Sequence, residues 1–153
     1  MAQAESSPGE LLNQAVRSLR RNWAAELGAW DLSPHQARAL RVIAESDGTR
    51  PSDLARALRI APRSATEVVD DLAAKGLVRR EPSPSDRRAV LVRLTDQGRA
   101  VSDQVRRARE ANSERFFARL SERDRADLGR ILRRLMDDQP EARTDIQWPA
   151  HPA

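Results

Sequence analysis

The fold is decided by residues 75–98, which read KGLVRREPSPSDRRAVLVRLTDQG. The runs at 77–80 and 89–94 carry the valine and leucine that are typical of strands. Between them, the segment at 82–86 holds two prolines, which do not fit inside a strand because proline lacks an N–H donor. The stretch therefore predicts a β-hairpin with a polar loop.

Two short helices are expected immediately before this hairpin. Pro51 and Pro62 suit the first turn of a helix, where a missing N–H leaves no hydrogen bond unmade. Apolar residues at helical spacing predict helices at 52–58 and 62–75, and Gly76 suits the position just past a helix end. Two helices joined by a tight turn form a helix-turn-helix. With the hairpin added, the sequence predicts a winged helix.

Longer amphipathic helices are expected on both sides of the winged helix. Apolar residues recur at every fourth position between 11 and 27, and Ser33 followed by Pro34 begins another helix. Thr95 and Ser121 are suitable N-caps for two more. The predicted fold class is therefore mainly α with a small β-hairpin wing.

The length predicts one domain with appended helices. The segments at about 10–32 and 95–138 carry apolar stripes that a small winged helix-turn-helix at about 33–94 does not cover completely. We expect them to be dimerisation helices that bury these stripes against a second copy; an intramolecular bundle in a monomer is the alternative. Residues 1–8 are expected to be disordered and 139–153 to form an extended tail.

Composition excludes several classes of function. Of 153 residues, 27 are basic and 23 are acidic, a formal net charge of +4, and 27 − 1 = 26 of the basic residues are arginine because Lys75 is the only lysine. The absence of cysteine excludes disulfides and thiolate zinc sites, and His35 and His151 are too few for a histidine metal centre. No apolar run approaches the roughly 18 residues of a membrane span, so we expect a cytoplasmic protein. No catalytic or phosphate-loop motif is present, so we expect neither an enzyme nor a cofactor.

The chain resembles the MarR family of bacterial transcription regulators. The residues that carry the resemblance are Ser52-Asp53-Leu54-Ala55, Lys75-Gly76-Leu77-Val78-Arg79-Arg80, Asp86-Arg87-Arg88, and Leu94-Thr95 with Gly98. The resemblance covers about residues 10–138. It implies a homodimer that binds pseudo-palindromic double-stranded DNA, commonly a repressor that releases DNA on binding a small aromatic or phenolic effector.

The second helix of a helix-turn-helix places its first residues against base edges in the major groove. Here these residues are Arg63, Ser64 and Thr66, followed by Glu67. Arg63 can pair with guanine O6 and N7, and the two hydroxyls can bind phosphate or bases. The alternative is that Arg63 is a solvated charge at a helix start.

Arginines gather in the wing. The hairpin holds five arginines and two acids between positions 79 and 93, a local excess of 5 − 2 = +3. An arginine at a wing tip can enter a narrow minor groove, where the negative potential is strongest. The alternative is a charged hairpin that is simply solvated.

Within the wing, Asp86 is expected to orient a guanidinium. The resemblance implies that one of Arg87 and Arg88 enters the minor groove while the other holds the wing, and the spacing does not choose between them. Because neighbours on a strand face opposite sides, at most one of Arg79 and Arg80 is expected to reach the DNA backbone.

The resemblance also implies an effector pocket between the dimerisation helices and the winged domain. The residues in the corresponding segments are Trp23, Trp30, His35 and Arg38. A structural role in the core is the alternative for each.

The second helix departs from the family pattern. It carries the acids Glu67, Asp70 and Asp71, and its expected N-cap is Ala61 in place of serine. These acids support a second hypothesis, a winged-helix module that binds a protein partner without specific DNA binding. Salt dependence separates the two, because phosphate contacts release counterions and protein contacts do not.

Overall fold

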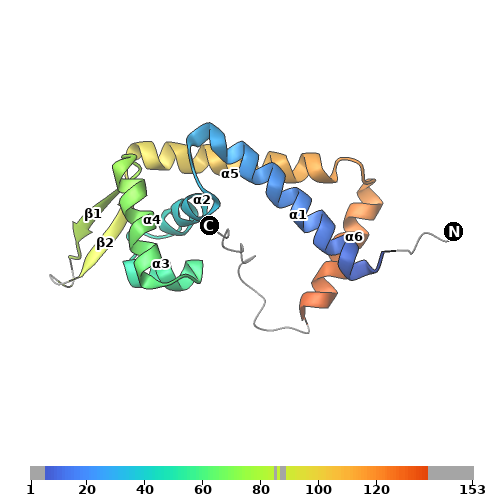
Figure 1. Cartoon of the computed structure of the whole chain (residues 1–153), viewed down its shortest axis with the longest axis horizontal. Coiled ribbons are helices and arrows are strands. Elements are labelled where there is room, and N and C mark those ends of the chain that lie inside the picture. Colours follow the sequence, from blue (N-terminus) through green and yellow to red (C-terminus); the bar gives the residue numbers. More distant parts are fainter. Residues whose placement is uncertain (1–5, 85, 87–88, 138–153) are drawn as a thin grey trace.

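The computed structural model describes residues 6–84, 86 and 89–137. Its elements in chain order are α1 (Pro8–Leu27), the 3-10 helix η1 (Gly28–Trp30), α2 (Pro34–Ala44), α3 (Pro51–Leu58), α4 (Pro62–Ala74), β1 (Val78–Pro82), β2 (Val90–Leu94), α5 (Asp96–Phe117) and α6 (Glu122–Asp137). The predicted fold class is confirmed. In Figure 1, α2, α3, α4 and the hairpin cluster at one end, α1 and α5 form a long arm, and α6 lies at the far end of that arm.

The helix-turn-helix and the hairpin share one hydrophobic core. Leu40 and Ile43 of α2, Leu54 of α3, Val69 of α4 and Val92 of β2 are each at most 1% exposed. Burial of one such side chain contributes about 1.5–3 kcal/mol. This core holds α4 and the hairpin in a fixed relation, although β2 lies far from α4 in the chain.

The signals predicted at the start of α2 and at the end of α4 are confirmed. The Ser33 hydroxyl accepts from the Gln36 N–H at 3.2 Å, and the Gln36 side chain accepts from the Ser33 N–H at 3.0 Å, so α2 begins with a capping box. Lys75 caps the end of α4, and Gly76 follows with φ +69°, a conformation that favours glycine.

Gly98 allows α5 to begin directly against the hairpin. A Cβ at this position would lie 1.8 Å from the Leu77 carbonyl oxygen. Thr95 completes the junction, because its N–H donates to the same oxygen at 3.0 Å and its hydroxyl donates to the Gly76 carbonyl at 2.7 Å. The Gly76-Leu77 and Leu94-Thr95 segments therefore contact each other. Gly98 allows this contact because it has no side chain.

The hairpin is longer than predicted at its first strand. β1 and β2 are antiparallel, with Val78 opposite Leu94 and Pro82 opposite Val90. β1 extends two residues past the predicted end at position 80, because Pro82 is tolerated as its last residue. Thr49 adds an isolated bridge to β2 through two backbone hydrogen bonds with Val92, of 3.0 and 2.8 Å.

The prediction that residues 1–8 are disordered is wrong at positions 7 and 8. α1 begins at Pro8 with Ser7 as its N-cap, and the Ser7 hydroxyl accepts from the Glu10 N–H at 3.3 Å. The Glu10 carboxylate accepts from the Ser7 N–H at 2.8 Å, which completes a capping box. Residues 1–5 and the predicted tail at 139–153 lie outside the described residues.

The last helix is left uncovered by the rest of the described chain. No residue of α6 is buried, and Leu135 is 60% exposed. Ile131 and Met136 are each 47% exposed, and Leu11 and Leu12 near the start of α1 are 54% and 44% exposed. An intramolecular bundle would bury these apolar side chains, so the described residues do not form the monomeric bundle considered as an alternative.

Candidate nucleic-acid interface

The first turn of α4 is open to solvent. The Arg63 side chain is 91% exposed, Thr66 is exposed and Ser64 is half-buried. The Thr66 hydroxyl donates to the Pro62 carbonyl at 3.1 Å, which leaves its oxygen free to accept. The N-cap Ala61 offers no side-chain acceptor to the first N–H groups of the helix. The turn therefore presents an accessible guanidinium beside backbone donors that lack a capping side chain.

Each acid of α4 is held by another residue of the chain. For Glu67, Asp70 and Asp71 the partners are Arg63 at 3.3 Å, Arg80 at 2.7 Å and Gln36 at 3.1 Å. Asp70 thereby joins α4 to β1, and Asp71 joins α4 to α2. These two acids position the helix within the fold, so they do not need a protein partner to explain them.

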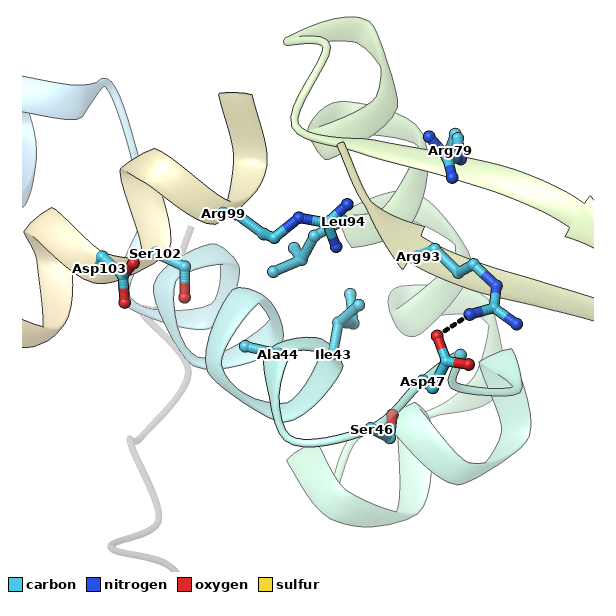
Figure 2. A pocket seen from close by; sticks show the side chains of 11 residues that line it. Ile43, Ala44, Ser46, Asp47, Arg79, Arg93, Leu94, Arg99, Ser102 and Asp103 are labelled. Atoms are coloured by element: carbon cyan, nitrogen blue, oxygen red, sulfur yellow. Dashed lines mark hydrogen bonds and ion pairs between the residues drawn. The ribbon is translucent and has the colours of Figure 1, made fainter. Parts of the chain in front are cut away.

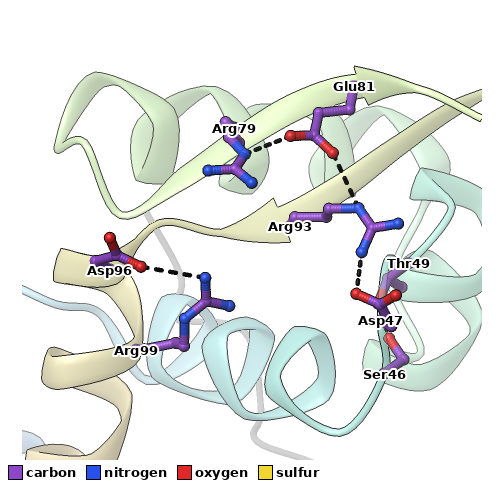
Figure 3. Close-up of polar contacts among 8 residues, drawn as sticks. All are labelled: Ser46, Asp47, Thr49, Arg79, Glu81, Arg93, Asp96 and Arg99. Carbon is purple, nitrogen blue, oxygen red and sulfur yellow. Dashed lines mark hydrogen bonds and ion pairs between the residues drawn. The ribbon is translucent and has the colours of Figure 1, made fainter.

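The described arginines of the hairpin strands are all ion-paired. Besides the pair between Arg80 and Asp70, Arg79 Nε lies 2.5 Å from one Glu81 oxygen, and Arg93 Nε lies 3.0 Å from the other (Figure 3). The positive excess predicted for the wing is therefore partly neutralised within the chain. Direct DNA contacts by Arg79 and Arg80 stay predictions.

The tip of the wing is described only in part. Asp86 is exposed, and its backbone carbonyl accepts from the Ala89 N–H at 2.9 Å. Its predicted role in orienting a guanidinium stays a prediction. Arg87 and Arg88 lie outside the described residues.

An ion pair between Arg93 and Asp47 was not predicted from the sequence. The Arg93 guanidinium pairs with Asp47 in the connection between α2 and α3, and Figure 3 shows it joined also to Glu81. The two partners are 46 residues apart, so no local spacing could find them. The bridge from Thr49 to Val92 brings this connection beside β2 and makes the pair geometrically accessible.

The two tryptophans predicted to line an effector pocket have packing roles. Trp23 and Trp30 are partly buried against the core, and Trp30 Nε1 donates to Gln104 Oε1 of α5 at 2.9 Å. Trp30 therefore ties the turn after α1 to α5. A ligand contact by either residue stays a prediction.

Arg38, a further predicted pocket residue, holds the end of α3. Its two terminal nitrogens donate to the carbonyls of Leu58 at 3.2 Å and Ala57 at 2.6 Å. A guanidinium is favourable there because the last carbonyls of a helix carry partial negative charge.

His35 is half-buried at the start of α2. A cavity of about 320 Å³ lies between α2, the hairpin and α5, and none of the four predicted pocket residues lines it (Figure 2).

Within the described ranges, no group of three or more histidine, aspartate or glutamate residues is placed to hold a metal ion. The helices of the same ranges include none with the length and apolar character of a membrane span.

In this chain, the first turn of α4 is open to solvent and the helix is tied to the hairpin. Winged helix-turn-helix proteins bind duplex DNA in this arrangement, with the helix in the major groove and the wing beside it. By its fold the chain is a winged helix-turn-helix protein. We call α4 the recognition helix from here on.

Comparison with known proteins places the chain more narrowly. The sequence pattern of the MarR family matches residues 30–89. The HTH-type transcriptional repressor Rv2887 of Mycobacterium tuberculosis is 30% identical over 139 residues, which span 90% of this chain and 100% of that protein. The crystal structure of reduced MarR from E. coli is 26% identical, with a TM-score of 0.76 over 88% of this chain and 99% of that chain. The protein belongs to the MarR family and is a DNA-binding transcriptional regulator.

A third relative matches over a shorter length. A Thauera aromatica protein, whose name assigns it to regulation of the hcr operon, is 33% identical over 108 residues. The match spans 71% of this chain and 65% of the length of that relative.

Proposed function

We propose that this regulator represses transcription by binding a pseudo-palindromic operator as a homodimer, and that a small aromatic or phenolic effector controls the binding. The observation that carries DNA binding is the 91% exposed side chain of Arg63 in the open first turn of the recognition helix. The proposed partner is chromosomal DNA, so the protein acts in the cytoplasm. It acts by binding alone, without catalysis or a cofactor.

Two exposed apolar faces support the homodimer. Leu11 and Leu12 of α1 and Ile131, Leu135 and Met136 of α6 lie on the arm that leads away from the winged domain. Burial of such faces against a second copy would remove them from water, which is the usual driving force of association. A two-fold axis through the arm would present two recognition helices to major grooves about 34 Å apart.

A relative supports the effector. The crystal structure of Rv2887 is a complex with p-aminosalicylic acid, a small aromatic acid; it is 28% identical to this chain, with a TM-score of 0.67 over 85% of this chain and 98% of that chain. We propose that this chain responds to a ligand of similar size. The sequence-based candidates for the pocket are Trp23, Trp30, His35 and Arg38.

The alternative of a protein-binding module loses its main support. That hypothesis rests on the acids of the recognition helix. Asp70 and Asp71 are engaged with Arg80 and Gln36, and Glu67 pairs with Arg63 on the same helix. The acids therefore do not make the recognition helix an unpartnered acidic surface.

The proposal is tested by fluorescence anisotropy with the full chain. A labelled duplex from the protein's own upstream region is compared with a scrambled duplex over several salt concentrations. We expect at least about 10³-fold tighter binding to the specific duplex and a steep fall with salt. Arg63→Ala should reduce the preference by about 10-fold or more, because one base contact is lost. Arg107→Ala, an exposed position on α5, is the matched control and should keep the preference.

The wing is tested in the same assay. Arg87→Ala combined with Arg88→Ala should weaken binding to both duplexes and flatten the salt slope by about one to two units. Equal affinity of the wild type for the two duplexes, without steep salt dependence, would contradict specific DNA binding and favour the protein-binding module.

A further inference from the structure

The hairpin is attached to the helix-turn-helix at two places. At the first, Arg80 of β1 pairs with Asp70 of the recognition helix at 2.7 Å. At the second, β2 contacts residues 47–49, which form the connection between α2 and α3. The first attachment joins the hairpin to the recognition helix, and the second joins it to the segment that leads into α3. Two attachments on different strands prevent a rotation of the hairpin that either one alone would allow.

The second attachment is built from three successive residues. Thr49 is buried and forms two backbone hydrogen bonds with Val92, of 3.0 and 2.8 Å. Gly48 packs so closely on β2 that an added Cβ would lie 3.4 Å from the guanidinium carbon of Arg93. Its φ of +110° is a conformation that residues with side chains rarely adopt. The backbone of the connection therefore lies directly on β2, and this brings Asp47 beside Arg93.

Arg93 joins the connection to both strands of the hairpin. Its guanidinium pairs with Asp47, and its Nε lies 3.0 Å from a carboxylate oxygen of Glu81 on β1 (Figure 3). A planar guanidinium presents its N–H donors in fixed directions, so one group can hold two carboxylates on different sides. The Arg93 side chain is 20% exposed, whereas Asp47 is 95% exposed. A phosphate contact by Arg93 would break both pairs, so this arginine serves the attachment of the hairpin.

We propose that Arg93 and Asp47 are positioning residues for DNA binding, because their ion pair fixes the direction of the wing relative to the recognition helix. Contact with two grooves at once requires the hairpin to be held before DNA arrives, since ordering it during binding would cost affinity. Neither residue contacts DNA in this arrangement. The inference rests on the proposed function, in which both the recognition helix and the wing bind the duplex.

Asp47→Asn gives opposite results under positioning and under charge alone. If only net charge matters, removal of an acid raises the affinity of a DNA-binding protein for duplex. If the ion pair positions the wing, its loss should lower that affinity by about 2- to 5-fold, the range that partly exposed ion pairs support. Glu45→Gln is the matched control, because it removes the same charge two residues earlier. Glu45 pairs with Arg41 of α2 at 3.1 Å, so this control should leave the affinity unchanged or raise it.

Two further variants test the direction of the wing. Arg93→Lys keeps the charge and removes the fork that holds two acids, so it should weaken duplex binding by a similar factor. Arg87→Ala combined with Arg88→Ala should weaken binding less in the Asp47→Asn background than in the wild type, because a wing that is not held contributes less. The same two changes should keep their full effect in the Glu45→Gln background.

Hydrogen exchange tests the attachment in the full chain without DNA. The N–H groups of Thr49 and Val92 each donate to the carbonyl of the other residue, so their exchange rates report the opening of the second attachment. Asp47→Asn and Arg93→Lys should speed exchange at both amides by about 2- to 5-fold, and Glu45→Gln should not.

Two results would overturn the positioning role. One is a duplex affinity of Asp47→Asn that equals or exceeds that of Glu45→Gln. The other is unchanged exchange at Thr49 and Val92 in both Asp47→Asn and Arg93→Lys. A wild-type protein that binds no duplex would refute the proposed function instead, and the exchange rates would then still decide whether Arg93 holds the wing.

Discussion

Gly98→Ala is expected to destabilise the protein through the junction between the hairpin and α5. The added Cβ would lie 1.8 Å from the Leu77 oxygen, whereas real Cβ contacts essentially never fall below 3.0 Å. The two elements must therefore separate by at least 3.0 − 1.8 = 1.2 Å at this point. Separation on this scale breaks the hydrogen bonds from Thr95 to Leu77 and Gly76, of 3.0 and 2.7 Å.

The cost follows from the shift that relieves the clash. Moving the backbone to admit the extra methyl group costs about 1–3 kcal/mol. Opening the junction loses two hydrogen bonds of about 1 kcal/mol each. We expect a loss of about 2–3 kcal/mol in the free energy of unfolding. For a chain of this length, a loss of that size lowers the melting temperature by roughly 4–12 °C.

Urea and thermal unfolding followed by circular dichroism measure this loss, at one fixed protomer concentration because dimerisation contributes to stability. Gly28→Ala is the matched control: Gly28 has φ −56°, and beyond its own helical turn no atom of the described residues lies within 4 Å of an added Cβ. Its backbone already suits alanine, so the control should gain about 0.4–1 kcal/mol. A Gly98→Ala variant with the wild-type unfolding midpoint would refute the argument that the close approach requires glycine.

Three further predictions concern the charges and the dimer. Glu67→Gln frees Arg63 from its 3.3 Å ion pair and removes a negative charge from the recognition helix. Duplex affinity at low salt should therefore rise by about 3-fold or more. An unchanged affinity would mean that this turn does not lie near the phosphates. The Arg80 and Asp70 side chains are 39% and 58% exposed, so Arg80→Gln and Asp70→Asn should show a coupling of about 0.2–1 kcal/mol in a double-mutant cycle of unfolding free energies. Strict additivity would contradict their pairing. Leu135 is 60% exposed on the apolar face of α6, and Leu135→Arg places a charge there. The variant should shift analytical ultracentrifugation profiles toward monomer. An unchanged sedimentation coefficient would mean that the dimer interface does not include this face.

The sequence predicts the elements of this fold well because their signals are local. Prolines at helix starts, Ser33 followed by Pro34, and Gly76 past a helix end depend on residues a few positions apart. The clear error in the described chain, the predicted disorder at positions 7 and 8, also concerns a local signal. Ser7 and Glu10 form a capping box that places the start of α1 at Pro8, and composition alone favoured disorder there.

The recognition helix shows what local reasoning leaves open. From the sequence, its acids are a departure that weakens the case for DNA binding. In the structure, Asp70 and Asp71 reach Arg80 and Gln36, which are 10 and 35 positions away in the chain. Whether an acid is an exposed repulsive charge or a tie between two elements depends on what the fold brings beside it, and spacing along the chain does not carry that information.

The sequence by itself determined the order of the elements, the family and the helix turn that is proposed to face DNA, because each of these rests on short-range patterns. Only the tertiary structure decided that Arg93 pairs with Asp47, that Arg38 holds the end of α3, and that Gly98 sits against the Leu77 carbonyl. The reason is physical. An ion pair or a close backbone approach forms between groups that packing brings within a few ångströms, and packing is set by the whole core.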